Sequence, residues 1–126
     1  MPIDNSIDFV TINIAVITIS DTRKEENDTS GDTLEKLIKE LGHNILERKI
    51  IPDNVTKIKE ILVKVSKKEE IDCIITTGGT GLTGRDTTPE AVKEIANKHI
   101  DGFGELFRQV SFNKIGTSAI QSRALA

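Results

Sequence analysis

The residues best suited to chemistry in this sequence are the glycines of one short stretch, TTGGTGLTGRDTTPEA, at residues 76–91. Gly78, Gly79 and Gly81 fall close together there, after an apolar segment that is typical of a buried parallel strand. A glycine-rich loop in that position exposes backbone N–H groups at the carboxyl end of the sheet, where such loops bind anions, typically phosphates. The stretch therefore predicts an anion-binding loop, with a flexible turn as the simpler alternative.

Part of the same stretch, residues 79–84, also matches the dinucleotide fingerprint G-x-G-x-x-G, and Asp101 follows at roughly the distance of a ribose-binding carboxylate. In that fold the third glycine lies in a helix. Here Gly84 is followed by the letters RDTTP, and we expect the helix to begin near Pro89 because the residue before a proline avoids helical angles. Gly84 then lies in a loop, so a dinucleotide-binding oxidoreductase is only the second alternative. A P-loop is excluded because an Arg-Asp pair replaces its Lys and hydroxyl.

Composition indicates one acidic globular domain. The chain has 126 residues, 37% of them hydrophobic and 29% charged, with a net charge of -3. This is enough apolar material for one core and too mixed for disorder. An acidic chain without Trp or Tyr offers no general attraction to nucleic acid or anionic membrane and few aromatic faces for bases. We expect neither nucleic acid nor a membrane as a partner.

The single cysteine and the N-terminus indicate a cytoplasmic protein. Cys73 lies in the apolar run IDCII, which is typical of a small buried hydrophobe and not of a catalytic thiol. One cysteine cannot form an internal disulfide, in keeping with a reducing compartment. The N-terminal letters MPIDNSIDF lack the basic and apolar regions of a signal peptide. His43 and His99 are isolated and have no partner at metal-ligand spacing.

Alternating strands and helices predict an α/β fold with a parallel sheet. Residues 11–20, 43–51 and 71–77 are apolar, rich in β-branched residues, and predict strands. Amphipathic spacing predicts helices over residues 34–41 and 55–65, between these strands. Only three strands are convincing, which is a thin sheet for this architecture.

The last part of the chain is predicted to be helical. Residues 116–126 predict a final helix, and an apolar stripe with helical spacing precedes it. The stripe consists of Phe103, Leu106, Phe107 and Val110. We expect the stripe to lie in the core, with a contact between subunits as the alternative.

The glycine stretch as a whole resembles the signature of the molybdenum cofactor biosynthesis family that includes MoaB and MogA. Other segments resemble blocks of that family in the same order, from about residue 11 to residue 126. These segments are ITISDTR, DTSGD, IIPDN, GFGELFRQVSF and IGTSAIQSRALA. The forms DTSGD and IGTSAIQSRALA are more similar to MoaB than to MogA. The resemblance implies a three-layer αβα domain with a mainly parallel central sheet.

The resemblance implies that the protein is a molybdopterin adenylyltransferase of molybdenum or tungsten cofactor biosynthesis. AMP would pass from Mg-ATP to the molybdopterin phosphate, and pyrophosphate would leave. Mg²⁺ is then the implied cofactor, ATP and molybdopterin are substrates, and no tightly bound prosthetic group is expected. The family further implies a trimer or hexamer and a metal-insertion protein of the same pathway as a partner. A non-catalytic member that binds pterin or assists assembly is the first alternative.

Two carboxylates match residues that are associated with function in the family: Asp53 in IIPDN and Asp86 in TGRDTTPEA. A phosphate nucleophile is already ionised near neutral pH, since its second pKa is about 6, and needs no general base. Both carboxylates are therefore expected to be catalytic by holding Mg²⁺. We expect them to follow neighbouring strands on one rim of the sheet. A helix cap near Val55 is the alternative for Asp53, and a turn stabiliser for Asp86.

Substrate-binding residues are carried over from the segments that match the family's pocket. The glycine loop is expected to hold the pterin phosphate through backbone N–H and hydroxyl groups. The carried-over residues are Thr77, Gly78, Gly79, Thr80, Gly81, Ser20, Asp21, Arg23, Asp28, Thr29, Ser30, Gly31, Ser122 and Arg123. An exposed helix face is the alternative for Ser122 and Arg123. Ser30 or Asp32 is expected to cap the first helix.

The resemblance also suggests domain boundaries. Residues 1–10 are expected to form a flexible arm, and residues 11–126 a single MoaB/MogA-like molybdopterin-binding domain. Family members continue past the QSRALA segment with a glycine, a further strand and a PG-x-P loop that helps to form the substrate site. We therefore expect the domain to be incomplete at its C-terminal side.

Overall fold

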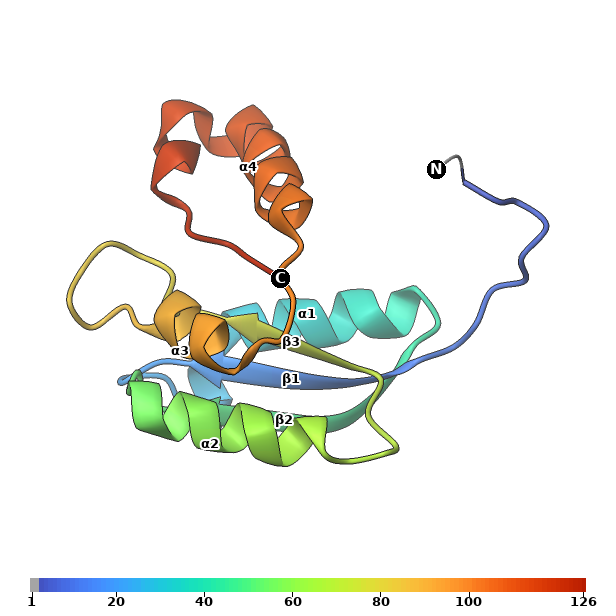
Figure 1. Ribbon diagram of the computed structural model, residues 1–126, viewed down its shortest axis with the longest axis horizontal. Coiled ribbons are helices and arrows are strands. Elements are labelled where there is room, and N and C mark those ends of the chain that lie inside the picture. Colours follow the sequence, from blue (N-terminus) through green and yellow to red (C-terminus); the bar gives the residue numbers. More distant parts are fainter. Residues whose placement is uncertain (1–2) are drawn as a thin grey trace.

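A computed structural model describes residues 3–126 and has a three-stranded parallel sheet at the centre of the fold (Figure 1). The strands are β1 (Asn13–Ile19), β2 (Asn44–Ile51) and β3 (Cys73–Thr77). Both β2 and β3 pair with β1 in parallel, in the order β2-β1-β3. The three predicted strands are thus confirmed. The expectation that Asp53 and Asp86 follow neighbouring strands is wrong, because the central strand lies between the two strands concerned.

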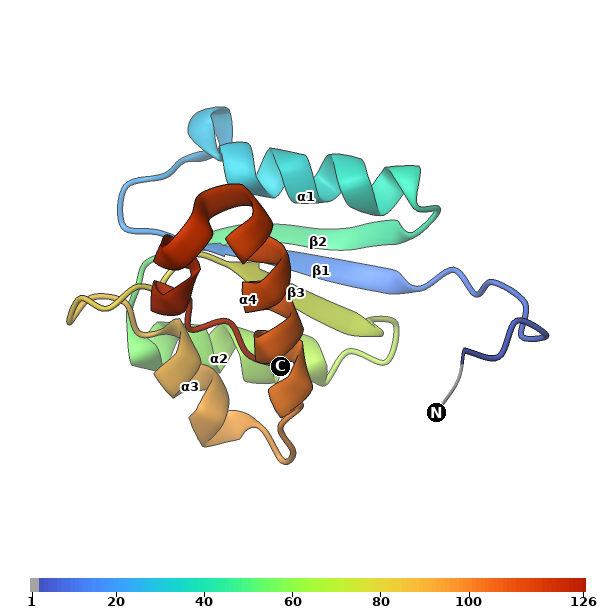
Figure 2. The same ribbon diagram turned by 90° about the horizontal axis from the view of Figure 1, so that it is seen from above.

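Helices cover both faces of the sheet, which confirms the three-layer arrangement (Figures 1 and 2). These helices are α1 (Thr29–Glu40), α2 (Val55–Ser66) and α3 (Thr88–Ile95). Successive side chains of a strand point to opposite faces. On β1, Ile14 and Val16 pack on the α1 side against Ile38. The alternate residues pack in a second cluster with α2 and α3, made of Ala15, Ile17, Ile19, Ile58, Leu62, Val65 and Ala91.

The last helical region differs from the prediction. Helix α4 (Asp101–Ile115) is followed by a 3-10 segment, η2 (Gly116–Gln121), and the chain then runs without regular structure. Gly116 has φ +61°, which ends the α-helix, so the continuous helix expected over residues 116–126 is wrong. The two segments pack on each other and stand on one side of the sheet in Figure 1.

The apolar stripe of α4 lies outside the core. Phe103 and Phe107 are each 46% exposed, and Leu106 and Val110 are exposed further. The prediction of a core position is wrong because residues 3–126 place only η2 closely against this helix. The two phenylalanine rings stack on each other, with centroids 6.2 Å apart.

The described part of the N-terminal segment runs away from the sheet (Figures 1 and 2). Residues 1 and 2 of the expected arm lie outside the described residues. The Phe9 ring packs against His43 at a centroid distance of 5.1 Å. Every helix in residues 3–126 is too short or too polar to cross a membrane.

Candidate functional site

The carboxyl ends of the three strands meet at one edge of the sheet, because Ile19 lies opposite Ile51 and Thr18 opposite Thr77. Three segments leave the sheet at this rim. Ser20 follows β1, Asp53 follows β2 after one proline, and Gly78 follows β3. The backbone N–H of Ser20 donates to Ile51 O at 2.9 Å and holds the first two segments together. The rim is where ligands bind in open α/β sheets.

The glycine loop, residues 78–87, needs glycine at its first two positions. Gly78 has φ +96° and Gly79 has φ +65°, which are left-handed conformations that other residues rarely adopt. A Cβ at Gly78 would overlap the backbone carbonyl of Ile19. At the end of the loop, Thr88 donates its N–H to Gly79 O at 3.1 Å and its hydroxyl to Gly78 O at 3.0 Å. These bonds close the loop onto the start of α3.

Several N–H groups of this loop have no partner in the protein. Within residues 3–126, the backbone N–H groups of Gly79, Thr80 and Leu82 donate to no protein acceptor. Unpaired N–H groups of a loop that begins with left-handed glycines are the donors of a typical anion-binding concavity. The loop therefore has free donors of the kind that the predicted anion-binding loop requires, without a specific match to a P-loop or a dinucleotide fold.

The dinucleotide alternative loses support here. Gly84 lies in the loop, four residues before α3 begins at Thr88, as expected from the following proline. Asp101 is the first residue of α4 and does not follow a strand. The third glycine and the acidic residue of the fingerprint are thus both misplaced.

Asp53 is held by the glycine loop. Its Oδ1 accepts hydrogen bonds from the backbone N–H of Thr87 at 3.0 Å and from the Thr87 hydroxyl at 2.5 Å. Its Oδ2 accepts no bond within residues 3–126 and would lie 2.8 Å from a Cβ at Gly79. The alternative of a helix cap is wrong, because Asn54 caps α2 by accepting from the Lys57 N–H at 3.0 Å. One oxygen of Asp53 is therefore turned toward the glycine loop.

Asp86 sits on the same loop and stabilises a turn. Its Oδ2 accepts from the Thr83 N–H at 2.9 Å and from the Thr83 hydroxyl at 2.6 Å. These bonds, helped by the charge of Arg123, lower the pKa of Asp86 below its usual value, so the group is ionised at neutral pH. The turn-stabiliser alternative is correct for Oδ2. The Gly81 N–H adds a weak contribution to the lowered pKa, and Oδ1 accepts no hydrogen bond of normal geometry within residues 3–126. A Cβ at Gly81 would lie 2.6 Å from Oδ2, so this carboxylate also lies against the glycines.

Asp21 connects the first and second segments of the rim. Its Oδ1 accepts from the Asp53 N–H at 3.0 Å, and its Oδ2 pairs with Arg85 at 2.6 Å. The Arg85 side chain is largely exposed. Asp21 thus positions Asp53 and holds a cation beside the loop. Both carboxylate oxygens of Asp21 therefore already have partners in the protein.

Arg123 comes from the C-terminal segment and contacts the glycine loop from another side. Its Nε donates to Gly81 O at 2.7 Å, one Nη donates to Asp86 O at 2.6 Å, and the other pairs with Glu90. The alternative of an exposed helix face is wrong, since η2 has ended before Arg123 and its side chain is only 29% exposed. Ser122 does not join the rim through its hydroxyl, which accepts from the Ala124 N–H at 3.4 Å.

Asp28 and Gly31 form the buried cap of α1, although they were predicted to bind substrate. Asp28 is fully buried and caps α1, where its carboxylate accepts from the Gly31 N–H at 3.1 Å and the Thr18 hydroxyl at 2.8 Å. Burial alone would raise the pKa of Asp28, but the bonds from Thr18, Gly31 and Arg48 outweigh it and lower the pKa. A substrate cannot reach a carboxylate in this position. The expected caps, Ser30 and Asp32, are wrong, because the helix begins earlier.

Three other predicted residues gather at the start of α1. One Nη of Arg23 donates to the Thr29 hydroxyl at 2.6 Å, and the Arg23 N–H donates to the Ser20 hydroxyl oxygen at 3.1 Å. Ser30 is exposed nearby on the first turn of the helix. This group adjoins the rim through Ser20 and does not contact the glycine loop directly.

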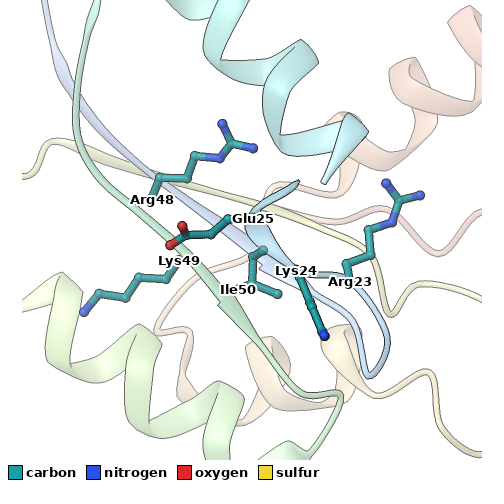
Figure 3. Close-up of a pocket in the computed structure, with 6 residues that line it drawn as sticks. All are labelled: Arg23, Lys24, Glu25, Arg48, Lys49 and Ile50. Carbon is teal, nitrogen blue, oxygen red and sulfur yellow. The ribbon is translucent and has the colours of Figure 1, made fainter. Parts of the chain in front are cut away.

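A hollow of about 470 Å³ lies beside the rim and is rich in cations. It is lined by Arg23, Lys24, Glu25, Arg48, Lys49 and Ile50. Figure 3 shows that the long side chains diverge, with Arg48 and Lys49 pointing to opposite sides. Arg48 is already paired with Asp28, Asp32 and Glu35. We place the candidate site at the glycine loop, where polar groups converge, and not in this hollow.

The residues that were not predicted from the sequence to take part in the site are Thr83, Thr87 and Glu90. Thr87 orients Asp53, Thr83 orients Asp86, and Glu90 pairs with Arg123. The local signal for Thr83 was its position three residues before an aspartate, a spacing that is common in turns. No local signal links Thr87 to Asp53, because the two lie 34 residues apart in sequence.

The two aspartates provide part of a set of ligands for a divalent cation. No group of three or more His, Cys, Asp or Glu side chains in residues 3–126 is arranged to hold a metal ion. Mg²⁺ is commonly bound by one or two carboxylates together with substrate phosphates and water. Asp53 Oδ2 and Asp86 Oδ1 are unpaired carboxylate oxygens beside an anion-binding loop, and they fit that mode.

Known proteins of one family are similar to this chain. A family model described as "Probable molybdopterin binding domain" matches residues 15–125. The chain is 47% identical over 111 residues to molybdenum cofactor biosynthesis protein B of Bacillus cereus, covering 87% of this chain and 66% of the relative. It is 43% identical over 122 residues to a probable molybdopterin adenylyltransferase of Methanocaldococcus jannaschii, covering 91% and 72%.

Solved structures have the same fold. The crystal structure of a molybdenum cofactor biosynthesis protein B matches with a TM-score of 0.88 and 44% identity, over 92% of this chain and 73% of that one. The tungsten cofactor synthesizing protein MoaB from Pyrococcus furiosus matches with a TM-score of 0.79 and 34% identity, over 92% and 72%. A MogA structure with a TM-score of 0.80 and 23% identity shares the fold, over 90% and 74%. The chain thus spans about two thirds to three quarters of the length of these relatives.

Proposed function

This chain belongs to the molybdopterin-binding family that includes MoaB and MogA, and from that premise we propose that it is a molybdopterin adenylyltransferase. One observation carries the proposal. Two aspartates, each with an unpaired oxygen, lie against a glycine loop whose N–H groups have no protein partner. A site of this kind suits a reaction between two phosphate compounds.

The reaction that fits is AMP transfer from ATP to the terminal phosphate of molybdopterin. An oxygen of the pterin phosphate attacks the α-phosphorus of ATP, a P–O bond forms, and the bond to the β-phosphate bridging oxygen breaks. Pyrophosphate leaves with the electron pair of that bond. Because the attacking phosphate is ionised near neutral pH, the site needs to neutralise and align charge, and no general base is required.

Different residues of the site would bind the phosphate, supply positive charge and hold the metal ion. The N–H groups of Gly79, Thr80 and Leu82 would hold a phosphate, as loops of this type do. Arg85, which reaches Asp21 at 2.6 Å, provides a cation on the exposed side of the loop. Asp53 Oδ2 and Asp86 Oδ1 would hold Mg²⁺ together with phosphate oxygens. When bound there, the ion would neutralise charge on the two polyanions.

The assembly of the protein is also proposed from the family. We propose that residues 11–126 act as one domain, that copies associate as a trimer or hexamer, and that a metal-insertion protein takes the product in the cytoplasm. The exposed apolar stripe of α4, Phe103, Leu106, Phe107 and Val110, supports association of copies. The choice between molybdenum and tungsten as the final metal lies downstream of this reaction.

The test is pyrophosphate release from Mg-ATP, measured with and without molybdopterin. Wild type is compared with Asp86→Asn, which keeps the shape of the side chain but removes its charge. Asp8→Asn, in the exposed N-terminal segment, is the matched control. We expect release that requires the pterin, falls at least about 100-fold in Asp86→Asn, and is unchanged in Asp8→Asn.

Two other results would decide against the proposal. Tight pterin binding by a folded wild type without pyrophosphate release would identify the non-catalytic alternative. Equal release by wild type and Asp86→Asn would place the chemistry elsewhere. Circular dichroism and thermal unfolding of each variant distinguish a lost reaction from a lost fold.

A further inference from the structure

We propose that Arg123 is a positioning residue that fixes the orientation of two peptide groups in the glycine loop, one of which holds Asp53. The proposal rests on the proposed function for its catalytic consequence. The positioning itself is argued from the contacts of Arg123 with residues 81–90. Arg123 was predicted to bind substrate, and the structure gives its guanidinium a different set of partners.

The guanidinium of Arg123 has three partners in the glycine loop and the first turn of α3. Arg123 donates to the carbonyl oxygens of Gly81 and Asp86 at 2.7 and 2.6 Å, and it pairs with the Glu90 carboxylate. Gly81 and Asp86 are the first and last residues of the loop segment GLTGRD, residues 81–86, which we call the excursion. One planar side chain therefore ties both ends of this excursion to the first turn of α3, which contains Glu90.

The direction of the Thr87 N–H follows from the geometry of the peptide bond that joins Asp86 to Thr87. In a planar trans peptide the C=O and the next residue's N–H point in opposite directions, and residues 3–126 contain no cis peptide. The Asp86 carbonyl points at Arg123, so the Thr87 N–H points away from it. That N–H donates to Asp53 Oδ1 at 3.0 Å. Arg123 thus sets the direction of a bond that holds the proposed catalytic carboxylate.

Arg123 also holds the peptide group that joins Gly81 to Leu82, at the other end of the excursion. The Gly81 carbonyl points at Arg123, so the Leu82 N–H points to the opposite side. Within residues 3–126 that N–H has no acceptor. Rotation of this peptide would remove a donor from the anion-binding loop. Arg123 therefore favours the loop conformation that keeps the donor available.

The three contacts of residue 123 require an arginine. Its guanidinium offers several N–H donors in a rigid plane, so it can reach two carbonyls and a carboxylate at once. A lysine ammonium keeps the charge but cannot reproduce this planar pattern. The Arg123 side chain is 29% exposed, so water competes only partly for these bonds. Because its donors bond protein groups, Arg123 stabilises the conformation of the loop and is not held free for a ligand.

The experiment compares amide hydrogen exchange of the whole chain in wild type, Arg123→Lys and Arg108→Lys, followed by mass spectrometry. Arg108 is the matched control, because it also bonds the C-terminal segment, donating to Ser122 O at 3.3 Å, and has no bond to the glycine loop. We expect exchange in residues 79–87 to be about tenfold faster in Arg123→Lys, with β1 unchanged. Arg108→Lys should leave residues 79–87 at the wild-type rate.

The same proteins are then assayed for pterin-dependent pyrophosphate release. We expect kcat to fall about tenfold or more in Arg123→Lys, with a smaller change in KM, because the loop and Asp53 are misplaced and no substrate contact is removed. Faster loop exchange in Arg123→Lys supports the inference even if wild type proves inactive, in which case only the proposed function fails. Unchanged loop exchange overturns it, and so does full activity of Arg123→Lys in an active wild type.

A second variant covers the case in which Arg123→Lys does not fold. Glu90→Gln leaves the guanidinium in place but removes the charge of its third partner. We expect exchange in residues 79–87 to increase by about twofold to threefold, because the ion pair between Arg123 and residue 90 is lost while the bonds of Arg123 to the two carbonyls remain. Wild-type exchange in this variant, together with an unfolded Arg123→Lys, would show that Arg123 stabilises the domain as a whole and would overturn the positioning role.

Discussion

Thr87 gives both of its hydrogen-bond donors to a single carboxylate oxygen of Asp53. The backbone N–H lies 3.0 Å from Oδ1 and the hydroxyl lies 2.5 Å from it. Because Oδ1 is occupied twice, Oδ2 is the oxygen left for a ligand, on the side of Gly79. The N-cap residue of α3 therefore determines which oxygen of Asp53, in the segment that follows β2, is presented to the rim.

Replacing Thr87 by valine tests this relationship, because valine has the same shape but lacks the hydroxyl. The backbone N–H bond to Asp53 remains, so we expect a partial effect. A hydrogen bond to a charged group contributes about 1.5–3 kcal/mol, which corresponds to roughly a tenfold or larger loss of kcat in pyrophosphate release. Thr56→Val, on the exposed face of α2, is the control and should retain wild-type kcat. Equal rates for Thr87→Val and wild type would show that the hydroxyl does not orient Asp53.

The positions of the strands along the chain could be predicted from the sequence, whereas the order of the strands in the sheet could not. Runs of β-branched residues at 11–20 and 71–77 located β1 and β3 to within two residues. Such a pattern says that a strand is buried but not which strand lies next to it. The order β2-β1-β3 therefore came only from the structure, and it placed the strands that precede Asp53 and Asp86 on either side of the central strand.

The candidate site was predictable where it is local and not where it depends on long-range contacts. The glycine loop could be inferred because Gly78 and Gly79 are consecutive and follow a buried strand. The pairing of Asp53 with Thr87 spans 34 residues. The burial of Asp28 depends on Thr18 and Arg48, which lie 10 and 20 residues away. No local pattern could separate this helix cap from a substrate ligand.

The glycine loop predicts a sharp contrast between two glycine substitutions. Gly78→Ala places a side chain at φ +96° against the carbonyl of Ile19, so we expect a loss of about 2 kcal/mol or more in free energy of unfolding. Gly84→Ala is the control, since Gly84 has no neighbour within 4 Å and no left-handed φ. It should change the free energy by no more than about 0.5 kcal/mol. Urea unfolding measures both, and similar values for the two variants would contradict the loop conformation.

Asp28 predicts a pH-dependent contribution to stability. Its pKa in the folded protein lies below the ordinary value of 3.8. The stabilisation is therefore fully present above about pH 4 and is lost as the pH falls through the lower, folded-state pKa. Asp28→Asn should reduce the free energy of unfolding at pH 7 by about 2–3 kcal/mol, because the amide places donors against those of Thr18 and Arg48. The difference from wild type should shrink as the pH falls below 3.8.

Asp32→Asn is the control for this measurement. Asp32 pairs with the same Arg48 at 2.7 Å, but its side chain is 62% exposed, and exposed pairs contribute little. Urea unfolding at several pH values should therefore give a much smaller loss for Asp32→Asn than for Asp28→Asn. A loss of the same size in both variants, or a pH-independent loss in Asp28→Asn, would contradict the role assigned to the buried carboxylate.

The apolar stripe of α4 predicts how copies of the chain associate. Phe107 is 46% exposed in the single chain and stacks on Phe103, so glutamate at this position costs little in the isolated fold. In a subunit contact the same change buries a charge without a partner, which is strongly unfavourable. Phe107→Glu should therefore shift the chain from oligomer to monomer in sedimentation velocity. Phe112→Glu, which is 55% exposed and lies off the stripe on the same helix, should sediment like wild type. A wild type that is monomeric at micromolar concentration, or equal sedimentation of both variants, would contradict association through this face.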